Sequence, residues 1–347
     1  MEYCFGLKKL TLAAMLFLII SSVYAQTVKG PNDLGLTYMK QGNFKEAVAE
    51  FTKAIEADHK NASGYANRAL ALAKLGNLTD AISDSTQAIE IDPKDFKAYT
   101  DRGQFYVKQG NLTAALSDYN EAIKINPKFA AAYNNRGIIY YNQGKITDAI
   151  SDYSKAVEVY PKDVIALVNR GKAYVKQGNF DAALMDYNKA IEFFPKEGIL
   201  YRKRGLVYIK KRDLSAAIAD YNKAIELNSK DSVAYYIRGS IYYDQQNFIQ
   251  AISDFTQLIA INSKDAKNYM IRALSYLREI KPNEAIADLT KALDLNPNYT
   301  KAYYNRAVGY YQLKQYDKAW ADVRKTQELG GTVNPGFIEA LKTASGK

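Results

Sequence analysis

Arginine and aspartate recur along this 347-residue chain at one fixed step of 34 residues, and each aspartate follows its arginine by 16 residues. A guanidinium beside a carboxylate forms a strong, often bidentate ion pair. A row of unpaired arginines would instead bind anionic ligands. Because the aspartate accompanies every copy of the arginine, the pattern favours a structural ladder of ion pairs within or between repeats. The expected pairs are Arg68 with Asp84, Arg102 with Asp118, Arg136 with Asp152, Arg170 with Asp186, Arg204 with Asp220, Arg238 with Asp254, Arg272 with Asp288, and Arg306 with Asp322.

Side chains suited to catalysis are scarce. The only histidine, His59, stands where other copies of the repeat carry proline, which indicates a surface position at a helix end. The only cysteine, Cys4, lies close to the N-terminus. The sequence contains no phosphate-binding glycine loop, His-Glu metal motif or nucleophile elbow. We therefore expect no enzymatic activity, no cofactor and no metal site.

The 34-residue step also predicts the elements that carry these charges. Nine alanines keep the step from Ala47 to Ala319. Apolar and small residues such as Tyr133, Gly137 and Tyr140 follow helical spacing. A glycine such as Gly144 separates the two halves of a unit, where a helix C-terminus favours left-handed backbone. Each unit is therefore expected to form two antiparallel helices that must stack on their neighbours to bury their apolar faces.

The later units replace this glycine by Arg212, Gln246, Ile280 and Lys314. A non-glycine residue in left-handed backbone costs about 1 kcal/mol. We therefore expect these turns to shift by one residue, with Asp213 and Asn247 taking the left-handed conformation.

The unit resembles the tetratricopeptide repeat. The third copy carries the pattern through Tyr99, Gly103, Tyr106, Ala115, Tyr119, Ala122 and Pro127. The resemblance implies an all-α fold, an α-solenoid in which antiparallel helix pairs form a right-handed superhelix. With Val28 as position 1, nine repeats occupy residues 28–333. Their boundaries are 28–61, 62–95, 96–129, 130–163, 164–197, 198–231, 232–265, 266–299 and 300–333.

Both ends of the chain differ from the repeats. Lys8 and Lys9 precede an apolar run that ends near the small residue Ala25, just before Gln26. This pattern is typical of a signal peptide over residues 1–25, cleaved between Ala25 and Gln26. The protein is therefore expected to be exported to the periplasm, the cell envelope or the medium; an uncleaved membrane anchor is the alternative.

The C-terminal residues 334–347 are expected to form a capping helix. Asn334 and Pro335 suit the N-cap and the first turn, and Phe337, Ile338 and Leu341 form one apolar stripe. This helix would cover the last repeat, where the single tryptophan of the chain, Trp320, is expected to pack beneath it.

The resemblance implies that the first helix of each repeat forms a concave wall through its positions 2, 5, 6, 9, 12 and 13. Residues that vary from repeat to repeat on this wall are candidates for partner binding. An apolar, aromatic group comprises Tyr141, Tyr236, Tyr243, Met270, Leu277, Tyr304 and Tyr311, which could alternatively pack on adjacent helices. A basic, amide-rich group comprises Lys108, Lys176, Lys210, Asn135 and Asn169.

These features predict a non-enzymatic scaffold for protein–protein interaction. It would bind a partner peptide or helix, acidic or extended in character, on the concave face. The formal net charge of +10 keeps a nucleic-acid-binding helical repeat as an alternative. A membrane-anchored assembly factor is a further alternative if the N-terminal segment is retained.

Overall fold

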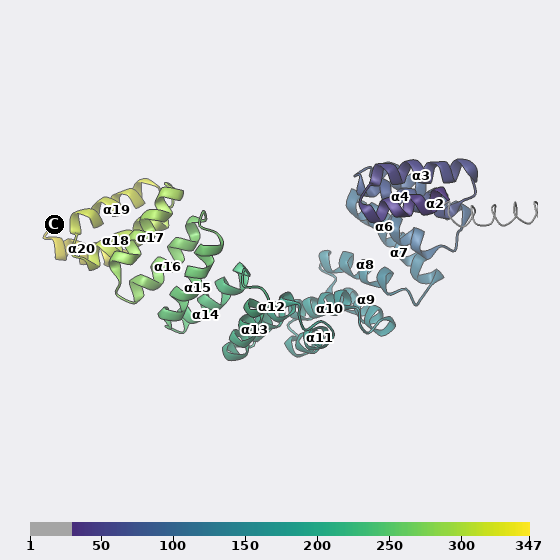
Figure 1. Cartoon of the computed structure of the whole chain (residues 1–347). Coiled ribbons are helices and arrows are strands. Elements are labelled where there is room, and N and C mark those ends of the chain that lie inside the picture. Colours follow the sequence, from purple (N-terminus) through teal and green to yellow (C-terminus); the bar gives the residue numbers. More distant parts are fainter. Residues whose placement is uncertain (1–29) are drawn as a thin grey trace, which may run out of the picture. The chain divides into compact units, whose positions relative to one another are not determined.

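A computed structural model of the chain describes residues 30–347. The predicted signal peptide, with Ala25, Gln26 and Cys4, lies outside the described residues. Within residues 30–347 all regular structure is helical, in 19 helices and without strands (Figure 1). None of these helices is long and apolar enough to cross a membrane. The predicted all-α solenoid of packed helix pairs is confirmed.

The chain divides into two compact units, with the boundary after Ala173. In the first unit each helix contacts the next along the chain from α2 to α8, and α8 contacts α9. The first helices of neighbouring pairs also contact one another, as α2 does α4 and α4 does α6. The helices are α2 (Pro31–Gln41), α3 (Phe44–Ala57), α4 (Ala62–Lys74), α5 (Leu78–Ile91), α6 (Phe96–Gln109), α7 (Leu112–Ile125), α8 (Ala130–Asn142) and α9 (Ile146–Val159), followed by α10 (Val164–Gln177), which continues into the second unit.

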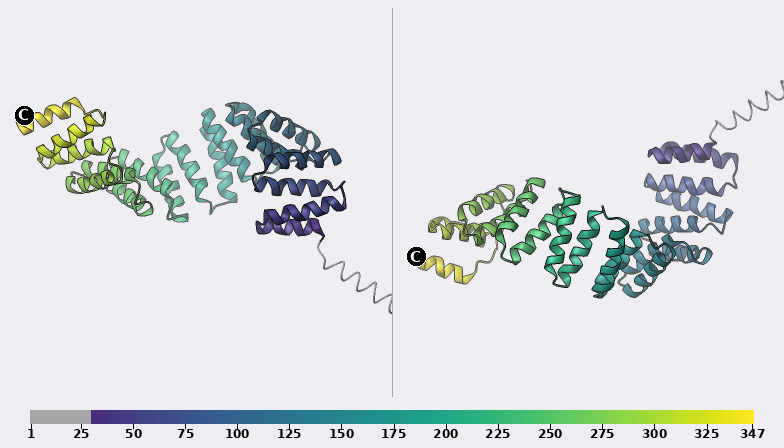
Figure 2. Two further views of the ribbon diagram at one scale, coloured as in Figure 1. Left: turned by 90° about the horizontal axis from the view of Figure 1, so that it is seen from above. Right: turned by 60° about the horizontal axis from the view of Figure 1, so that its bottom comes forward.

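The second unit repeats this arrangement, and successive helices from α11 to α20 contact each other (Figure 2). Its helices are α11 (Phe180–Phe193), α12 (Gly198–Lys210), α13 (Leu214–Leu227), α14 (Ser232–Asp244), α15 (Phe248–Ile261), α16 (Ala266–Arg278), α17 (Pro282–Leu295), α18 (Thr300–Gln312), α19 (Tyr316–Glu328) and α20 (Pro335–Ser345). We call the surface formed by α2, α4, α6 and α8 in the first unit, and by α12, α14, α16 and α18 in the second, the first-helix face.

Small residues hold the two helices of a pair close together. The periodic alanines are fully buried, as at Ala115 and Ala149. Tyr119 on α7 fills the space left by Gly103 on α6, where an added Cβ would lie 2.6 Å from the tyrosine ring. Any larger residue at Gly103 would therefore push the tyrosine out of the core.

The turns between paired helices correct one expectation. Arg212, Gln246, Ile280 and Lys314 themselves adopt left-handed backbone, with φ between 55° and 62°. The expected shift of the turn is wrong, because Asp213 and Asn247 are the N-caps of the following helices instead. The packing of two long helices on either side fixes the turn, and it outweighs the local steric cost of about 1 kcal/mol.

Helix α20 covers the end of the second unit. Asn334 caps it by accepting a hydrogen bond from the backbone N–H of Gly336, and Pro335 occupies its first turn, as expected. Leu341 is fully buried against Ala307, Ala319 and Val323. Trp320 packs in the same cluster, and its indole N–H donates to Ser345 Oγ at 3.1 Å.

Candidate functional site

The structure brings the periodic arginines and aspartates together. In the pair α8–α9, Arg136 Nη2 lies 2.7 Å from Asp152 Oδ1, and Arg136 Nε lies 2.8 Å from Asp152 Oδ2. The contact is bidentate and joins the two helices of one pair, so the ion pairs of the ladder form within repeats. The same geometry holds Arg68 to Asp84, Arg102 to Asp118, Arg204 to Asp220, Arg238 to Asp254, Arg272 to Asp288 and Arg306 to Asp322.

Burial shapes the energetics of these ion pairs. The aspartate side chains are buried and the arginine side chains are about four-fifths buried. The hydrogen bonds that Arg136 donates to Asp152 raise the pKa of Arg136, against the opposing effect of burial. Removing either partner would leave a charge in a largely dry place, which makes the pairs part of the framework. Arg170 and Asp186 lie on opposite sides of the boundary between the two units.

Each arginine has a second hydrogen-bond partner, which the recurring residues did not reveal. Arg136 Nη1 donates to Asn120 Oδ1 on α7, the second helix of the preceding pair, at 2.6 Å. The signal was present, because a hydroxyl or amide residue stands 16 positions before every arginine of the ladder. The equivalent acceptors are Thr52, Thr86, Ser154, Asn188, Asn222, Thr256 and Thr290.

Tyrosines complete the surroundings of the guanidinium groups. The Arg136 guanidinium carbon lies 5.8 Å from the ring centroid of Tyr133 and 5.9 Å from that of Tyr140. Such cation–π contacts add modest stabilisation. A single arginine thus ties together three helices from two neighbouring pairs, and each of its three guanidinium nitrogens donates a hydrogen bond within the protein.

Most of the apolar candidates for partner binding make contacts within the protein. Leu277 is only 7% exposed and belongs to the core around α16 and α17, so its prediction as a partner contact is corrected. Tyr304 and Tyr311 contact the ring of Phe337 on α20, with centroids 5.8 Å and 5.5 Å apart. They pack on the capping helix, as the alternative interpretation stated.

Two further tyrosines are engaged by neighbours. The Tyr243 hydroxyl accepts a hydrogen bond from Arg278 Nε at 3.3 Å, and its ring contacts Phe248. Lys172 Nζ lies 4.5 Å from the ring centroid of Tyr141, which is half-buried. Only Tyr236, which is 49% exposed, presents a large part of its ring to solvent among the predicted tyrosines.

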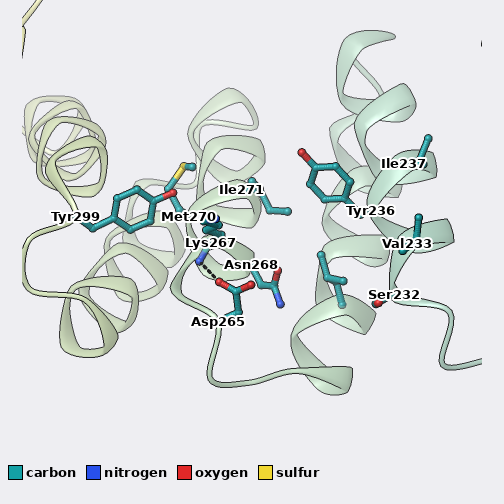
Figure 3. Close-up of a pocket in the computed structure, with 11 residues that line it drawn as sticks. Ser232, Val233, Tyr236, Ile237, Asp265, Lys267, Asn268, Met270, Ile271 and Tyr299 are labelled. Atoms are coloured by element: carbon teal, nitrogen blue, oxygen red, sulfur yellow. Dashed lines mark hydrogen bonds between the residues drawn. The ribbon is translucent and has the colours of Figure 1, made fainter. Parts of the chain in front are cut away.

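Tyr236 and Met270 both line a pocket of about 510 Å³ between α14 and α16 (Figure 3). Its apolar wall also includes Val233, Ile237 and Ile271. In Figure 3, Tyr236 and Ile271 extend toward each other from the two helices. A polar edge completes the lining, through Ser232, Asp265, Lys267, Asn268 and Tyr299.

The basic and amide-rich candidates lie on the surface. Lys108, Lys176 and Lys210 are exposed at the ends of their helices. Lys108 and Asn135 line one pocket of about 240 Å³ in the first unit, with residues of α6 and α8 such as Gln104 and Ile138. The Asn169 amide donates to Asn134 Oδ1 at 3.0 Å, so one of the candidate asparagines is held by its neighbour.

A buried carboxyl group lies on the same helix as Lys108. Burial and, to a smaller extent, the charge of Asp95 raise the pKa of Asp101 from 3.8 to about 6, while Lys97 opposes both effects. The group therefore changes its charge near pH 6, on the same helix as the exposed Lys108.

Exposed apolar residues mark the first-helix face of the second unit, and the sequence analysis did not single them out. Ile199 and Leu206 on α12 and Val233 on α14 are 45–48% exposed. Ile199 and Val233 stand at position 2, where other repeats carry Ser63, Lys97 or Lys301, and this difference was visible in the sequence. Of these residues, Val233 lines the 510 Å³ pocket together with Tyr236.

The same face is basic. We count charges at the wall positions 2, 5, 6, 9, 12 and 13 of the four repeats that contain α12, α14, α16 and α18. In total these positions carry six cations and one anion, Asp244. The cations are Arg202, Lys203, Lys210, Lys267, Arg278 and Lys301. The fold and this surface define the class of the protein, a helical-hairpin solenoid with an apolar, basic face.

Comparison with known proteins agrees with that class. Sequence models described as TPR repeat or tetratricopeptide repeat match residues 32–96, 86–117, 103–144, 128–196, 205–246, 232–265 and 272–330. The chain belongs to the tetratricopeptide repeat family. No curated protein matches the chain in sequence.

Solved structures show the same fold. A repeat-containing protein from Cytophaga hutchinsonii is 20% identical, with a TM-score of 0.57 over 68% of this chain and 97% of that one. Pseudomonas aeruginosa pilF is 17% identical, with a TM-score of 0.50 over 61% of this chain and 97% of that one. A tetratricopeptide repeat protein from Parabacteroides merdae is 25% identical, with a TM-score of 0.49 over 73% and 99% of the two chains.

Proposed function

We propose that this protein is a non-enzymatic scaffold that binds a protein partner on its first-helix face. Proteins of the family generally act as scaffolds for protein–protein interaction. The observation that carries the proposal is the group of exposed apolar side chains, Ile199, Leu206, Val233 and Tyr236, on consecutive first helices. Apolar surface grouped in this way is typical of an interaction site.

The excess of cations on the same face favours an acidic partner. Lys210 and Lys267 are exposed and make no ion pair within residues 30–347. Opposite charge on the partner would speed association and make binding sensitive to salt. The Arg–Asp ladder and the buried alanines hold the helices in place before binding, so a partner segment is bound with little ordering of the scaffold.

The test is an affinity pull-down from the native envelope fraction with matched charge reversals. Lys108→Glu with Lys210→Glu changes two exposed residues of the first-helix face. Lys128→Glu with Lys196→Glu makes the same change in charge at exposed residues of the inter-repeat loops. The proposal expects the first variant to lose the partner and the second to keep it. Equal capture by both variants would contradict the proposal.

We further propose that the scaffold works after export. The support is the N-terminal pattern of Lys8 and Lys9, an apolar run and a small residue at Ala25. Mass spectrometry of the protein purified from its native host should then find Gln26 as the first residue. An intact N-terminus beginning at Met1 in a membrane fraction would favour a retained anchor instead.

A further inference from the structure

The 510 Å³ pocket between α14 and α16 has the size and lining of a binding site. Pockets that hold ligands or side chains span about 300–1,000 Å³, with mostly apolar walls and a few polar groups. Six apolar side chains from α14, α15 and α16 form the wall here, among them the flexible Met270 and the half-exposed Tyr236. A methionine in such a wall can adapt to side chains of different shape.

The polar residues at the edge of the pocket determine which partner groups can lie next to an apolar side chain that enters it. Asp265 is the N-cap of α16, and its Oδ1 accepts the backbone N–H of Lys267 at 2.9 Å. Its charge therefore stabilises the N-terminus of α16. The ammonium groups of Lys267 and of Lys301, at the same position one repeat later, make no ion pair within residues 30–347.

An amide group lies in the same wall. Asn268 is 8% exposed, and its Nδ2 donates to the backbone carbonyl of Asn262 at 3.1 Å. Among the described residues no donor reaches its side-chain oxygen, which lies within the lining of the pocket. A partner N–H would find an acceptor there.

We propose that this pocket takes one bulky apolar side chain, such as leucine or phenylalanine, from an acidic segment of the protein partner. The anchor fills the space between Tyr236 and Met270, and the flanking carboxylates meet Lys267 and Lys301. The inference rests on the proposed function and specifies the chemistry that the first-helix face recognises. A basic segment is disfavoured because the wall positions of these four helices carry one anion and six cations, of which Arg202 is paired with the carboxylate of Asp231.

Fluorescence anisotropy with synthetic peptides tests this inference on the purified chain. The probe is a labelled 12-residue peptide with one phenylalanine among aspartates and glutamates. Two matched probes replace the phenylalanine by alanine, or the acidic residues by lysine. Val233→Asp places a charge in the pocket wall, and Ile249→Asp makes the same change at a residue of α15 that is 63% exposed. Circular dichroism establishes that both variants are folded.

We expect the acidic phenylalanine probe to bind, and the alanine probe to bind about 10- to 100-fold more weakly, because a fully buried phenylalanine contributes that much to affinity. Val233→Asp should lower the affinity for the acidic phenylalanine probe about 10-fold or more, and Ile249→Asp should leave this affinity unchanged. Lys267→Glu should weaken the acidic probe and strengthen the lysine probe.

Two outcomes would overturn the inference. One is equal affinity of the wild-type protein for the phenylalanine and alanine probes, or no binding of either at millimolar concentration. The other is unchanged binding to Val233→Asp. Neither outcome touches the charge-reversal pull-down, which would still report whether the first-helix face captures a native partner. The two proposals can therefore fail separately.

Discussion

Breaking one ion pair of the ladder should destabilise the protein far more than breaking an exposed pair on the same helix. In Asp152→Ala, Arg136 keeps its contact with Asn120 but loses two short hydrogen bonds to the carboxylate. Loss of one partner of a buried pair costs about 3–5 kcal/mol. Alanine regains up to about 0.7 kcal/mol of helix propensity, and Arg136 is 19% exposed. We therefore expect a loss of about 2–4 kcal/mol.

Lys155→Ala is the matched control, because the Lys155–Glu158 pair on α9 is 55% and 67% exposed. Exposed pairs contribute about 0–1 kcal/mol, so this variant should unfold close to the wild type. The assay is urea denaturation followed by circular dichroism, combined with hydrogen exchange of α8 and α9. Exchange is included because repeat proteins can unfold locally, so one global midpoint can miss the loss. If Asp152→Ala retains both the wild-type midpoint and the wild-type protection of α8 and α9, the structural role of the ladder is refuted.

Three further predictions follow from the fold. Asp101→Asn should stabilise the protein at pH 7, because the folded-state pKa of Asp101, about 6, lies above the ordinary 3.8. The wild type therefore loses up to about 3 kcal/mol of stability as the pH rises through 4 to 6. In urea titrations the stabilities of the two proteins should converge below pH 4, and a difference that stays constant with pH would contradict this. Ile280→Gly should stabilise by about 0.5–1 kcal/mol by relieving a φ of 55°. Gly144→Ala places a side chain at a φ of 78° and should destabilise the protein by about 1 kcal/mol. Thermal melting temperatures that shift in the same direction for both variants would refute the argument. Leu341→Ala should lower the stability by about 2–5 kcal/mol. Loosening of α20 should also shift the fluorescence emission of Trp320 to longer wavelength, whereas an unchanged spectrum would show that the helix stays docked.

The framework could be predicted from sequence because its residues repeat strictly. The Arg–Asp ladder follows from two residue types that always occur together at one spacing. The polar acceptors such as Asn120 and Thr86 follow the same rule but vary between three residue types, which hides them from a search for one recurring residue. Left-handed Ile280 was unexpected because local steric preference opposes it, and the packing of α16 and α17 decides the turn.

The residues exposed on the first-helix face were harder to predict than the framework. Leu277 and Tyr243 share a helix face with residues of the inner wall, and spacing along one helix shows only that. Their burial depends on how closely the next helix approaches, since α16 contacts α18 and Arg278 reaches back to Tyr243. Exposure of Ile199 and Val233 depends on the same approach. Periodicity therefore indicated which helices form the first-helix face, and the structure was needed to identify the exposed residues on them.

The proposed function places the partner on the first-helix face, whose group of exposed apolar side chains lies on α12 and α14. The most direct test places a photo-crosslinking phenylalanine derivative at Leu206 on α12 or at Met185 on α11, which are 45% and 72% exposed. After irradiation in the native envelope fraction, we expect a partner adduct from Leu206 and none from Met185. Adducts from Met185 alone, or equal adducts from both positions, would contradict the account.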